Sequence, residues 1–407
     1  MTDNQKNTLP KNWELKTLGE VCLLKNGYAF KSDDYKEAGI PMIRISDIND
    51  NEIQLKNTVK VLESEDYQRF FVEYGDILIA MSGATTGKFG IYKNKEKAYQ
   101  NQRVGNFQIT NKKLLDKDFL YFSLHSLKRK IEADAYGGAQ PNISSKKIEE
   151  LQIPLPPLPE QQKIVQKIES LFTELETGTK ALKTALNQLK IYRQAVLNHF
   201  LTNDNWKTVK LGDVCDRIFD GPFGSNLKSS DYTSSGVQVV RLENIGFMEF
   251  FEDKETFVNE DKYQSLIKHE VFEGDIIFSS FIGDYIRTTI LPNLKYKAIA
   301  KADCFCVRPK EKFIDKQFLT FVLSSIRTQK ILVLAVHGAT RPRINTTQLK
   351  SFSFPLPSLE IQTQIVAEIE KRMVAADALE ASLKSQVINA ENLRQSILKR
   401  AFEGKLV

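Results

Sequence analysis

Residues 154–165 read PLPPLPEQQKIV, and residues 355–366 read PLPSLEIQTQIV, 201 positions further along the chain. Each stretch is a proline-rich corner that opens a long run favourable to helix. Residues 160–201 contain no proline and one glycine, and residues 361–403 contain neither. Because proline and glycine interrupt helices, both runs predict helices of about 40 residues, roughly 60 Å long at 1.5 Å per residue.

A 4-3 spacing of apolar residues runs along both predicted helices. The positions we expect in this seam are Ile164, Ile168, Leu171, Leu175, Leu182, Leu189, Ile365, Ile369, Leu379, Leu383, Leu393 and Ile397. The flanking positions are largely Lys, Glu, Gln and Asn, a pattern typical of coiled coils. The alternative, ordinary core helices of a large α/β domain, is disfavoured because such helices average about three turns. We therefore expect the two helices to pack on each other, antiparallel.

The sequence ahead of each corner is duplicated as well. WELKTLGEVC from Trp13 matches WKTVKLGDVC from Trp206, and GGAQPNI from Gly137 matches GATRPRI from Gly338. The offset between the copies rises only from 193 to 201 residues, so one unit is repeated in tandem with small insertions. A period this long exceeds that of stacking repeats, so each half is a domain with an attached helix.

Each repeated domain has the pattern of a mixed α/β structure. Short apolar runs at 77–80, 276–279 and 304–307 lie between Gly, Asp and Asn and predict strands. Helical spacing predicts helices over 117–134 and 316–333. The expected fold class is thus two tandem α/β (α+β) globular domains joined by two long helices in an antiparallel coiled coil, with pseudo-two-fold symmetry. The expected segments are a first domain at 1–153, a central helix at 154–203, a second domain at 204–354 and a C-terminal helix at 355–407.

Composition narrows the class of protein. With 407 residues the chain suits two or three domains, and 57 Lys and Arg against 51 Asp and Glu permit a nucleic-acid partner without demonstrating one. The cysteines, at 22, 215, 304 and 306, form no CxxC pair and predict buried free thiols in a reducing cytoplasm. No run of 18 apolar residues occurs, so we expect no membrane span.

The chain resembles a known family, the specificity subunits of type I restriction–modification systems. The resemblance covers essentially the whole chain and rests on these segments: LGEV at 18–21, PLP at 154–156, EQQKIV at 160–165, RQAVL at 193–197, PLP at 355–357, RQSIL at 394–398 and AFEGKL at 401–406. One departure occurs at 360–363, where EIQT does not keep the Glu-Gln-Gln of the first copy.

The resemblance implies a protein that reads DNA and catalyses nothing. Each domain would recognise one half of a bipartite site in double-stranded DNA. The helices would dock two methyltransferase subunits, and motor-nuclease subunits would join them. The methyl donor, ATP and magnesium would bind only to those partners, and this chain would hold no cofactor or metal.

The residues themselves offer no catalytic motif. The chain lacks the Asp/Asn-Pro-Pro-Tyr/Phe tetrapeptide of adenine methyltransferases. SGATTGK at 82–88 looks like a phosphate-binding loop, but its glycines are one residue too close and Phe89 replaces the hydroxyl residue that would hold magnesium. The alternatives are a fused nuclease or methyltransferase, a specificity subunit of another bipartite restriction system, and a coiled-coil adaptor that does not read DNA.

Sequence readout requires polar and basic side chains in loops between strands. In the first half the candidates are Lys25, Asn26, Tyr28, Lys31, Arg44, Ser82, Thr85, Thr86, Lys88, Asn101, Gln102, Arg103, Gln140 and Asn142. In the second half they are Ser225, Asn226, Lys228, Arg241, Arg287, Thr288, Lys301, Arg341, Arg343 and Asn345. For any single residue, a solvated surface position is an equally good interpretation. Arg44 and Arg241 match each other in the repeat, so a structural role is open for both.

Overall fold

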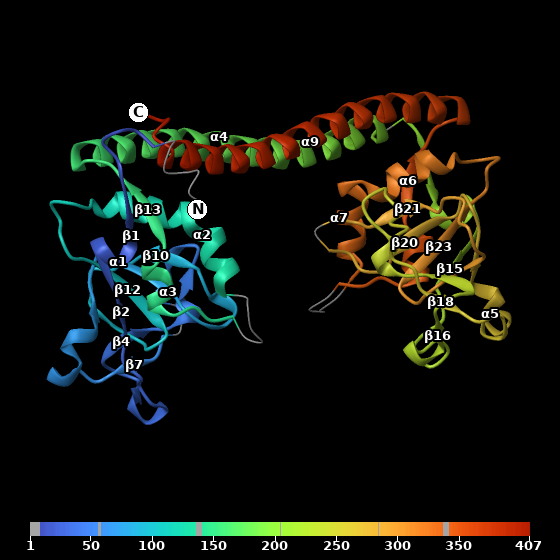
Figure 1. Ribbon diagram of the computed structural model, residues 1–407. Helices are drawn as coiled ribbons and strands as arrows, with labels where there is room; N and C mark the ends of the chain where they lie inside the picture. The colour runs from blue at the N-terminus through green and yellow to red at the C-terminus, as the bar shows by residue number, and fades with distance from the viewer. Residues whose placement is uncertain (1–8, 56–57, 136–140, 204, 284, 337–341) are drawn as a thin grey trace. The chain divides into compact units, whose positions relative to one another are not determined.

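The computed structural model describes residues 9–55, 58–135, 141–203, 205–283, 285–336 and 342–407. The chain divides into two compact units. Unit 1 comprises Met1–Ala181 with Gln386–Val407, and unit 2 comprises Leu182–Ser385. Each unit holds one mixed α/β body together with part of both long helices (Figure 1).

Three sheets build the body of unit 1. A six-stranded sheet pairs, in order, β2 (Cys22–Asn26), β12 (Val104–Ile109), β9 (Ile77–Ala80), β10 (Phe89–Ile91), β6 (Asn51–Ile53) and β5 (Ile48–Asn49). A five-stranded sheet pairs β3 (Tyr35–Lys36), β7 (Lys60–Val61), β4 (Ile40–Ile43), β11 (Ala98–Gln100) and β8 (Phe71–Val72). The third sheet pairs β1 (Glu14–Thr17) with β13 (Gln152–Leu155), and three helices complete the body: α1 (Leu18–Val21), α2 (Lys117–Ala135) and α3 (Ser145–Glu149).

Unit 2 repeats this topology. Its first sheet pairs β15 (Cys215–Phe219), β23 (Cys304–Pro309), β20 (Ile276–Ser279) and β21 (Thr288–Ile290). Its second sheet pairs β16 (Tyr232–Thr233), β18 (Phe257–Val258), β17 (Val237–Val240), β22 (Ala298–Ala300) and β19 (Glu270–Val271), and its third pairs β14 (Lys207–Lys210) with β24 (Ser353–Leu356). The helices of this body are α5 (Glu260–Leu266), α6 (Lys316–Ser324), α7 (Ile326–Leu334) and α8 (Thr346–Ser351). The tandem duplication is thus confirmed in the order in which the strands pair.

One predicted helix is wrong in its continuity. The helix expected over 316–333 is broken at Ser325, whose φ of −73° and ψ of 146° are extended. The Ser325 hydroxyl accepts a hydrogen bond from the backbone N–H of Thr328 and so caps a new helix, α7. Gln194 helps, because its side-chain oxygen accepts the N–H of Ile326. The corresponding helix of unit 1, α2, is continuous as predicted.

Two long helices are also confirmed. They are α4 (Leu158–Leu201) and α9 (Leu359–Phe402), each of 44 residues. In unit 1 Arg394 of α9 reaches Glu176 of α4, with 3.4 Å between Nη1 and Oε1. In unit 2 Arg193 of α4 pairs with both Asp377 and Glu380 of α9. Arg372 of α9 also lies over the ring of Phe200 of α4, so in unit 2 the residue numbers rise along α4 as they fall along α9, which is the expected antiparallel packing.

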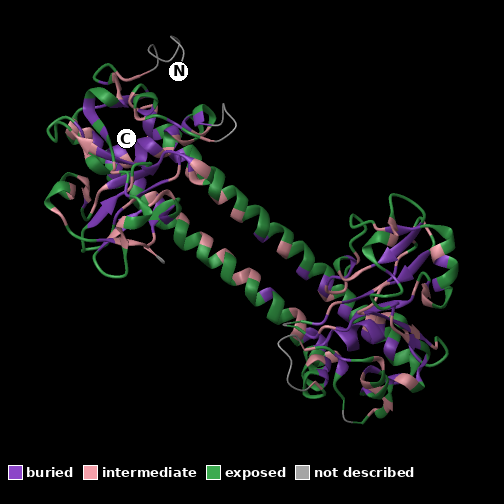
Figure 2. Cartoon of the chain, turned by 90° about the horizontal axis from the view of Figure 1, so that it is seen from below, coloured by how far each residue is buried: buried purple, intermediate pink, exposed green. Residues whose placement is uncertain are grey.

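Ten of the twelve predicted seam residues are buried or half-buried, and the prediction is wrong at the other two, Leu379 and Leu393. Leu379 and Leu393 are each 50% exposed, whereas Met373, Ala376 and Leu383 are buried. The packed row in α9 contains Glu380 and Arg394 next to those two leucines, because both charged residues pair across to α4 within their own unit. Figure 2 shows that the middle parts of both helices are otherwise mostly exposed.

A buried glutamine near the start of each long helix bonds that helix to its body. The Gln161 side chain donates to the carbonyl oxygens of Leu114 and Pro156 and accepts the N–H of Asp116. Gln362 does the same in unit 2, with Phe313, Pro357 and Asp315 as its partners. The segment at 360–363 departs from the family pattern but keeps the glutamine that makes these three hydrogen bonds.

The four cysteines are buried and free, as predicted. Cys304 and Cys306 both lie in one buried apolar cluster, as expected of alternate residues in a strand. Burial raises the pKa of the Cys22 thiol to about 12, so this group stays a neutral thiol. Over the described part of the chain, no helix combines the length and apolar character that crossing a membrane requires.

Candidate nucleic-acid interface

The loop after β2 and the loop after β11 meet in unit 1. The N–H of Tyr28 donates to the carbonyl oxygen of Gln100 at 2.9 Å, and Tyr28 also forms a β-bridge with Asn101. Gly27 permits this approach, since a Cβ there would lie 2.0 Å from the Gln100 oxygen. Gly221 has the same role in unit 2, where a Cβ would lie 2.1 Å from the carbonyl carbon of Lys301.

Two further predicted loops join this cluster. Ser82 and Asn142 form a β-bridge, and the N–H of Gly83 donates to the oxygen of Pro141. Arg103 links the two pairs of loops, because its Nη1 lies 3.3 Å from the Ser82 hydroxyl. The structure therefore brings together four separate stretches of the first half that contain predicted contact residues.

The same loops gather in unit 2 with different side chains. Phe281 and Arg343 form the bridge that corresponds to Ser82 and Asn142. Arg343 forms an ion pair with Asp303 and lies over the rings of Phe281 and Phe223, at 5.3 and 6.0 Å from their centroids. Its side chain is still 44% exposed, so it remains available to a ligand.

Arg44 and Arg241 have mainly structural surroundings. Each begins a short 3-10 turn, in which its backbone N–H donates to the side chain of Asp47 or Asn244. Arg241 also pairs with Glu243 at 3.0 Å. Burial raises the pKa of Asp47, although the N–H and the charge of Arg44 oppose this effect. The structural interpretation left open from the repeat is therefore the one that these contacts favour.

Two predicted contact residues need correction. Thr86 and Thr288 are only 3% and 0% exposed, so their side chains cannot meet a ligand in this conformation. The Thr86 hydroxyl donates to the oxygen of Gly83 and stabilises the loop instead. Ser82 is also largely buried, at 6% exposed, but its hydroxyl faces Arg103.

The remaining candidates lie at or near the surface. The exposed ones are Lys25, Asn26, Lys31, Gln102, Arg103, Asn142, Ser225, Asn226, Lys228, Arg343 and Asn345. Those of intermediate exposure are Tyr28, Thr85, Lys88, Asn101, Arg287 and Lys301. Gln140 and Arg341 lie outside the described residues. The exposed side chains remain predictions as DNA contacts.

Sequence reasoning missed two acidic residues at the centre of the unit 2 cluster. Asp303 has a left-handed backbone, with φ of 73°, and its N–H donates to Asp220 at 2.9 Å. Burial raises the pKa of Asp220 to about 6, against the lowering effects of the Gly221 N–H and the Arg343 charge. The available signal was the repeat, since Asp220 and Asp303 stand where the first half has Asn26 and Arg103.

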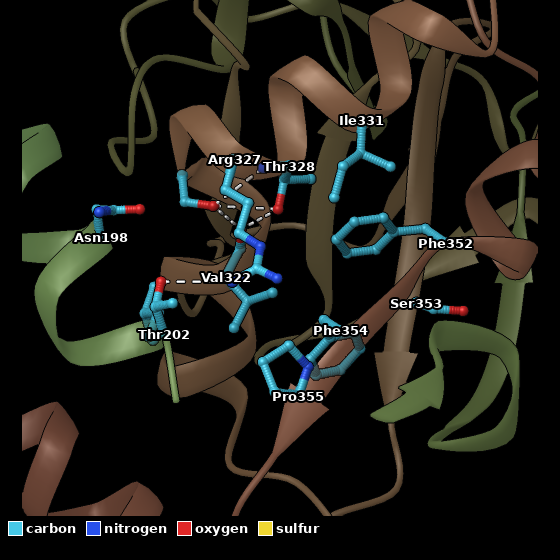
Figure 3. A pocket seen from close by; sticks show the side chains of 12 residues that line it. Asn198, Thr202, Val322, Arg327, Thr328, Ile331, Phe352, Ser353, Phe354 and Pro355 are labelled. Atoms are coloured by element: carbon cyan, nitrogen blue, oxygen red, sulfur yellow. Dashed lines mark hydrogen bonds between the residues drawn. The ribbon is translucent and has the colours of Figure 1, made fainter. Parts of the chain in front are cut away.

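A separate hollow in unit 2 lies where the end of α4 meets α7 and β24 (Figure 3). Its apolar wall includes Val322, Phe352 and Phe354. Its polar groups bond to one another, because the Thr328 hydroxyl donates to the oxygen of Val322 and Arg327 reaches Thr202. This hollow is a packing joint between helix and body. Among the described residues, no three His, Cys, Asp or Glu side chains are grouped so that they could hold a metal ion.

The family model and two sequence relatives of this chain are described as type I restriction specificity domains or subunits. The family described as the type I restriction modification DNA specificity domain matches residues 10–184 and again 203–389. The EcoBI specificity subunit of Escherichia coli is 27% identical over 97% of this chain and 86% of its own length. The MjaVIII specificity subunit of Methanocaldococcus jannaschii is 27% identical over 98% of this chain and 94% of its own length.

Solved structures share the fold. One is a chain from a structure described as the basis of complex assembly and conformational transition of the type I R-M system. It has a TM-score of 0.74 and 21% sequence identity, and the match covers 98% of this chain and 99% of that chain. The HsdS subunit from Thermoanaerobacter tengcongensis has a TM-score of 0.57 and 20% identity, covering 98% of each chain.

Proposed function

This chain belongs to the family of type I restriction modification DNA specificity domains, and from this membership we propose that it selects the DNA target of a type I restriction–modification complex. Each unit reads one half of a bipartite site in double-stranded DNA. Catalysis of methyl transfer and cleavage lies with partner subunits, which also bind the methyl donor, ATP and magnesium. The expected location is the cytoplasm, where those partners act on chromosomal DNA.

One observation carries this proposal: the two bodies share one backbone fold but differ in the side chains on its loops. Ser82 and Asn142 of unit 1 correspond to Phe281 and Arg343 of unit 2, bridged in the same way. Base readout depends on the donors, acceptors and charge of such side chains. Two equal frames with unequal loops suit two different half-sites.

The helices supply the surface for methyltransferase subunits in this proposal. Large apolar side chains are exposed on both, with Ile191 at 70%, Val374 at 68% and Ile388 at 62%. A group of large exposed apolar side chains marks a surface that contacts a partner. Leu379 and Leu393, which the packing of the two helices leaves uncovered, belong to the same set.

The decisive experiment is co-expression with the cognate methyltransferase subunit and mapping of methylated adenines on genomic DNA by single-molecule sequencing. We expect a bipartite motif with a fixed gap and one methylated adenine in each half. A continuous motif, or no methylation despite a stable complex, would overturn the two-headed proposal and favour an adaptor that does not read DNA. The isolated chain, supplied with the methyl donor and target DNA, should transfer no methyl groups.

A further inference from the structure

Arg103 in unit 1 and Arg343 in unit 2 each place a guanidinium beside the same position of the repeated fold. That position is Ser82 in unit 1 and Phe281 in unit 2, whose bridges to Asn142 and Arg343 correspond. Arg103 donates to the Ser82 hydroxyl, and Arg343 lies 5.3 Å from the centre of the Phe281 ring.

The two arginines come from different loops. Met81 and Ser280 are equivalent, because each donates its N–H to the residue that precedes the long strand, which is Arg103 in one unit and Asp303 in the other. Arg103 therefore corresponds to Asp303, and Arg343 corresponds to Asn142. The cation stays at one place in the frame while the loop that supplies it changes.

Asp303 holds Arg343 at this place. Its carboxylate accepts the Arg343 guanidinium and, at 2.7 Å, the hydroxyl of Ser280. Its backbone N–H donates a hydrogen bond to the Asp220 carboxylate. Its carbonyl oxygen accepts the N–H of Ser280 at 2.9 Å. Contacts on every side fix its left-handed backbone, so the carboxylate has little freedom.

We propose, on the basis of the DNA-reading function above, that Arg103 and Arg343 each read a guanine in their own half-site and that Asp303 is the positioning residue for Arg343. Arginine suits guanine because its planar fork can donate two hydrogen bonds to O6 and N7 in the major groove. An arginine held by a carboxylate and by aromatic rings presents that fork in one orientation. It therefore discriminates between bases, where a mobile cation would contact only phosphate.

The test uses the complex of the full chain with its methyltransferase subunits. Its affinity is measured for the target duplex, for duplexes with each specified base changed, and for a duplex without the site. In Arg343→Ala we expect discrimination at one guanine of the second half-site to fall roughly 5- to 100-fold, with the other positions unchanged. Arg103→Ala should act in the same way on the first half-site alone.

Asp303→Asn separates positioning from mere structure. Asparagine tolerates the left-handed backbone and keeps an oxygen for Ser280, but it removes the charge that holds Arg343. We expect loss of discrimination at the same guanine as in Arg343→Ala, unchanged melting temperature, and equal or tighter binding to the duplex without the site, because a negative charge has been removed. Arg327→Ala on α7 controls for the loss of one cation and should leave discrimination unchanged.

Two results would overturn this inference. One is a uniform loss of affinity in Arg343→Ala for every duplex, which would mark a phosphate contact. The other is intact discrimination in Asp303→Asn. Both presuppose that the wild-type complex prefers its split target; if it shows no sequence preference at all, the proposed function itself fails.

Discussion

Gln161 and Gln362 make the same three hydrogen bonds in the two units, each joining a long helix to the loop that precedes a body helix and to the proline corner. Both side chains are fully buried. In Gln161→Leu the N–H of Asp116 and two carbonyl oxygens lose their partner without access to water. We expect the free energy of unfolding of unit 1 to fall by about 3 kcal/mol in urea denaturation, since each orphaned buried group costs roughly 1–3 kcal/mol.

The neighbouring Gln162 provides the control, because it is exposed. Gln162→Leu should change the free energy of unfolding by less than about 0.5 kcal/mol. Equal effects of the two substitutions would show that the corner does not depend on the buried amide.

Arg193 and Arg394 occupy equivalent places, 201 residues apart, and each reaches acidic residues of the other helix. The Arg193 side chain is only 15% exposed, and the pKa of Glu380 is lowered by hydrogen bonds from Lys384 and Arg193. A double-mutant cycle of Arg193→Ala and Glu380→Ala should give a coupling free energy of about 1 kcal/mol. A cycle on Arg394 and Glu176 should give less, because Glu176 is 67% exposed. Equal coupling in both pairs would contradict this account.

His125 should make unit 1 sensitive to acid. Burial beside Phe89 and Tyr121, together with the smaller effects of the Arg394 and Lys128 charges, lowers the pKa of His125 to about 4. The unfolded histidine titrates near its usual pKa of 6.5, so unfolding takes up a proton between pH 6.5 and 4. The stability that neutral His125 contributes is therefore complete above pH 6.5 and is lost as the pH falls through 4. In His125→Phe, the free energy of unfolding should decline less steeply over this range; an identical slope would refute the assignment.

Asp220 should act in the opposite direction in unit 2. Its folded pKa of about 6 lies above the usual 3.8, mainly because of burial. Its contribution to stability is complete below pH 3.8 and is lost as the pH rises through 6. Asp220→Asn keeps an oxygen for the N–H groups of Gly221 and Asp303, and it copies Asn26 of unit 1. We expect a higher melting temperature than wild type above pH 6 and no gain near pH 4. A lower melting temperature at pH 7 would show that the carboxylate charge is needed.

The sequence predicted the long helices because their signals are local: proline-free length and a 4-3 apolar period. The phase of the seam was less determined, since Leu171 and Phe172 both satisfy a 4-3 spacing and only packing selects between them. The apolar pattern selected Leu379 and Leu393 instead of their neighbours Glu380 and Arg394. These charged residues lie in the packed row because each has a long aliphatic stem and a partner of opposite charge.

The candidate interface was predictable only as a set of loops. The repeat identified the segments around Pro141 and Pro342, and the structure brings them to Ser82 and Phe281. The pair of Asp303 and Arg343 was not accessible to sequence reasoning, because the two residues lie 40 positions apart and meet only through tertiary structure. Thr288 was misassigned for a related reason: its polar side chain suggested a surface, but it is fully buried where β21, an edge strand of its sheet, packs against α6.

If α4 and α9 set the gap between half-sites, then changing their length in register should change the recognised DNA. Deletion of one heptad from each helix, residues 179–185 and 380–386, removes segments that correspond at an offset of 201 residues and preserves the seam. Seven residues of helix span about 10 Å, or roughly three base pairs. Methylation mapping of the shortened complex should give the same two half-site sequences with a gap about two to three base pairs shorter. Deletion of four residues from each helix would turn the seam away from its partner, and that variant should lose stability instead. An unchanged gap in the heptad variant would show that the partner subunits, not these helices, fix the spacing.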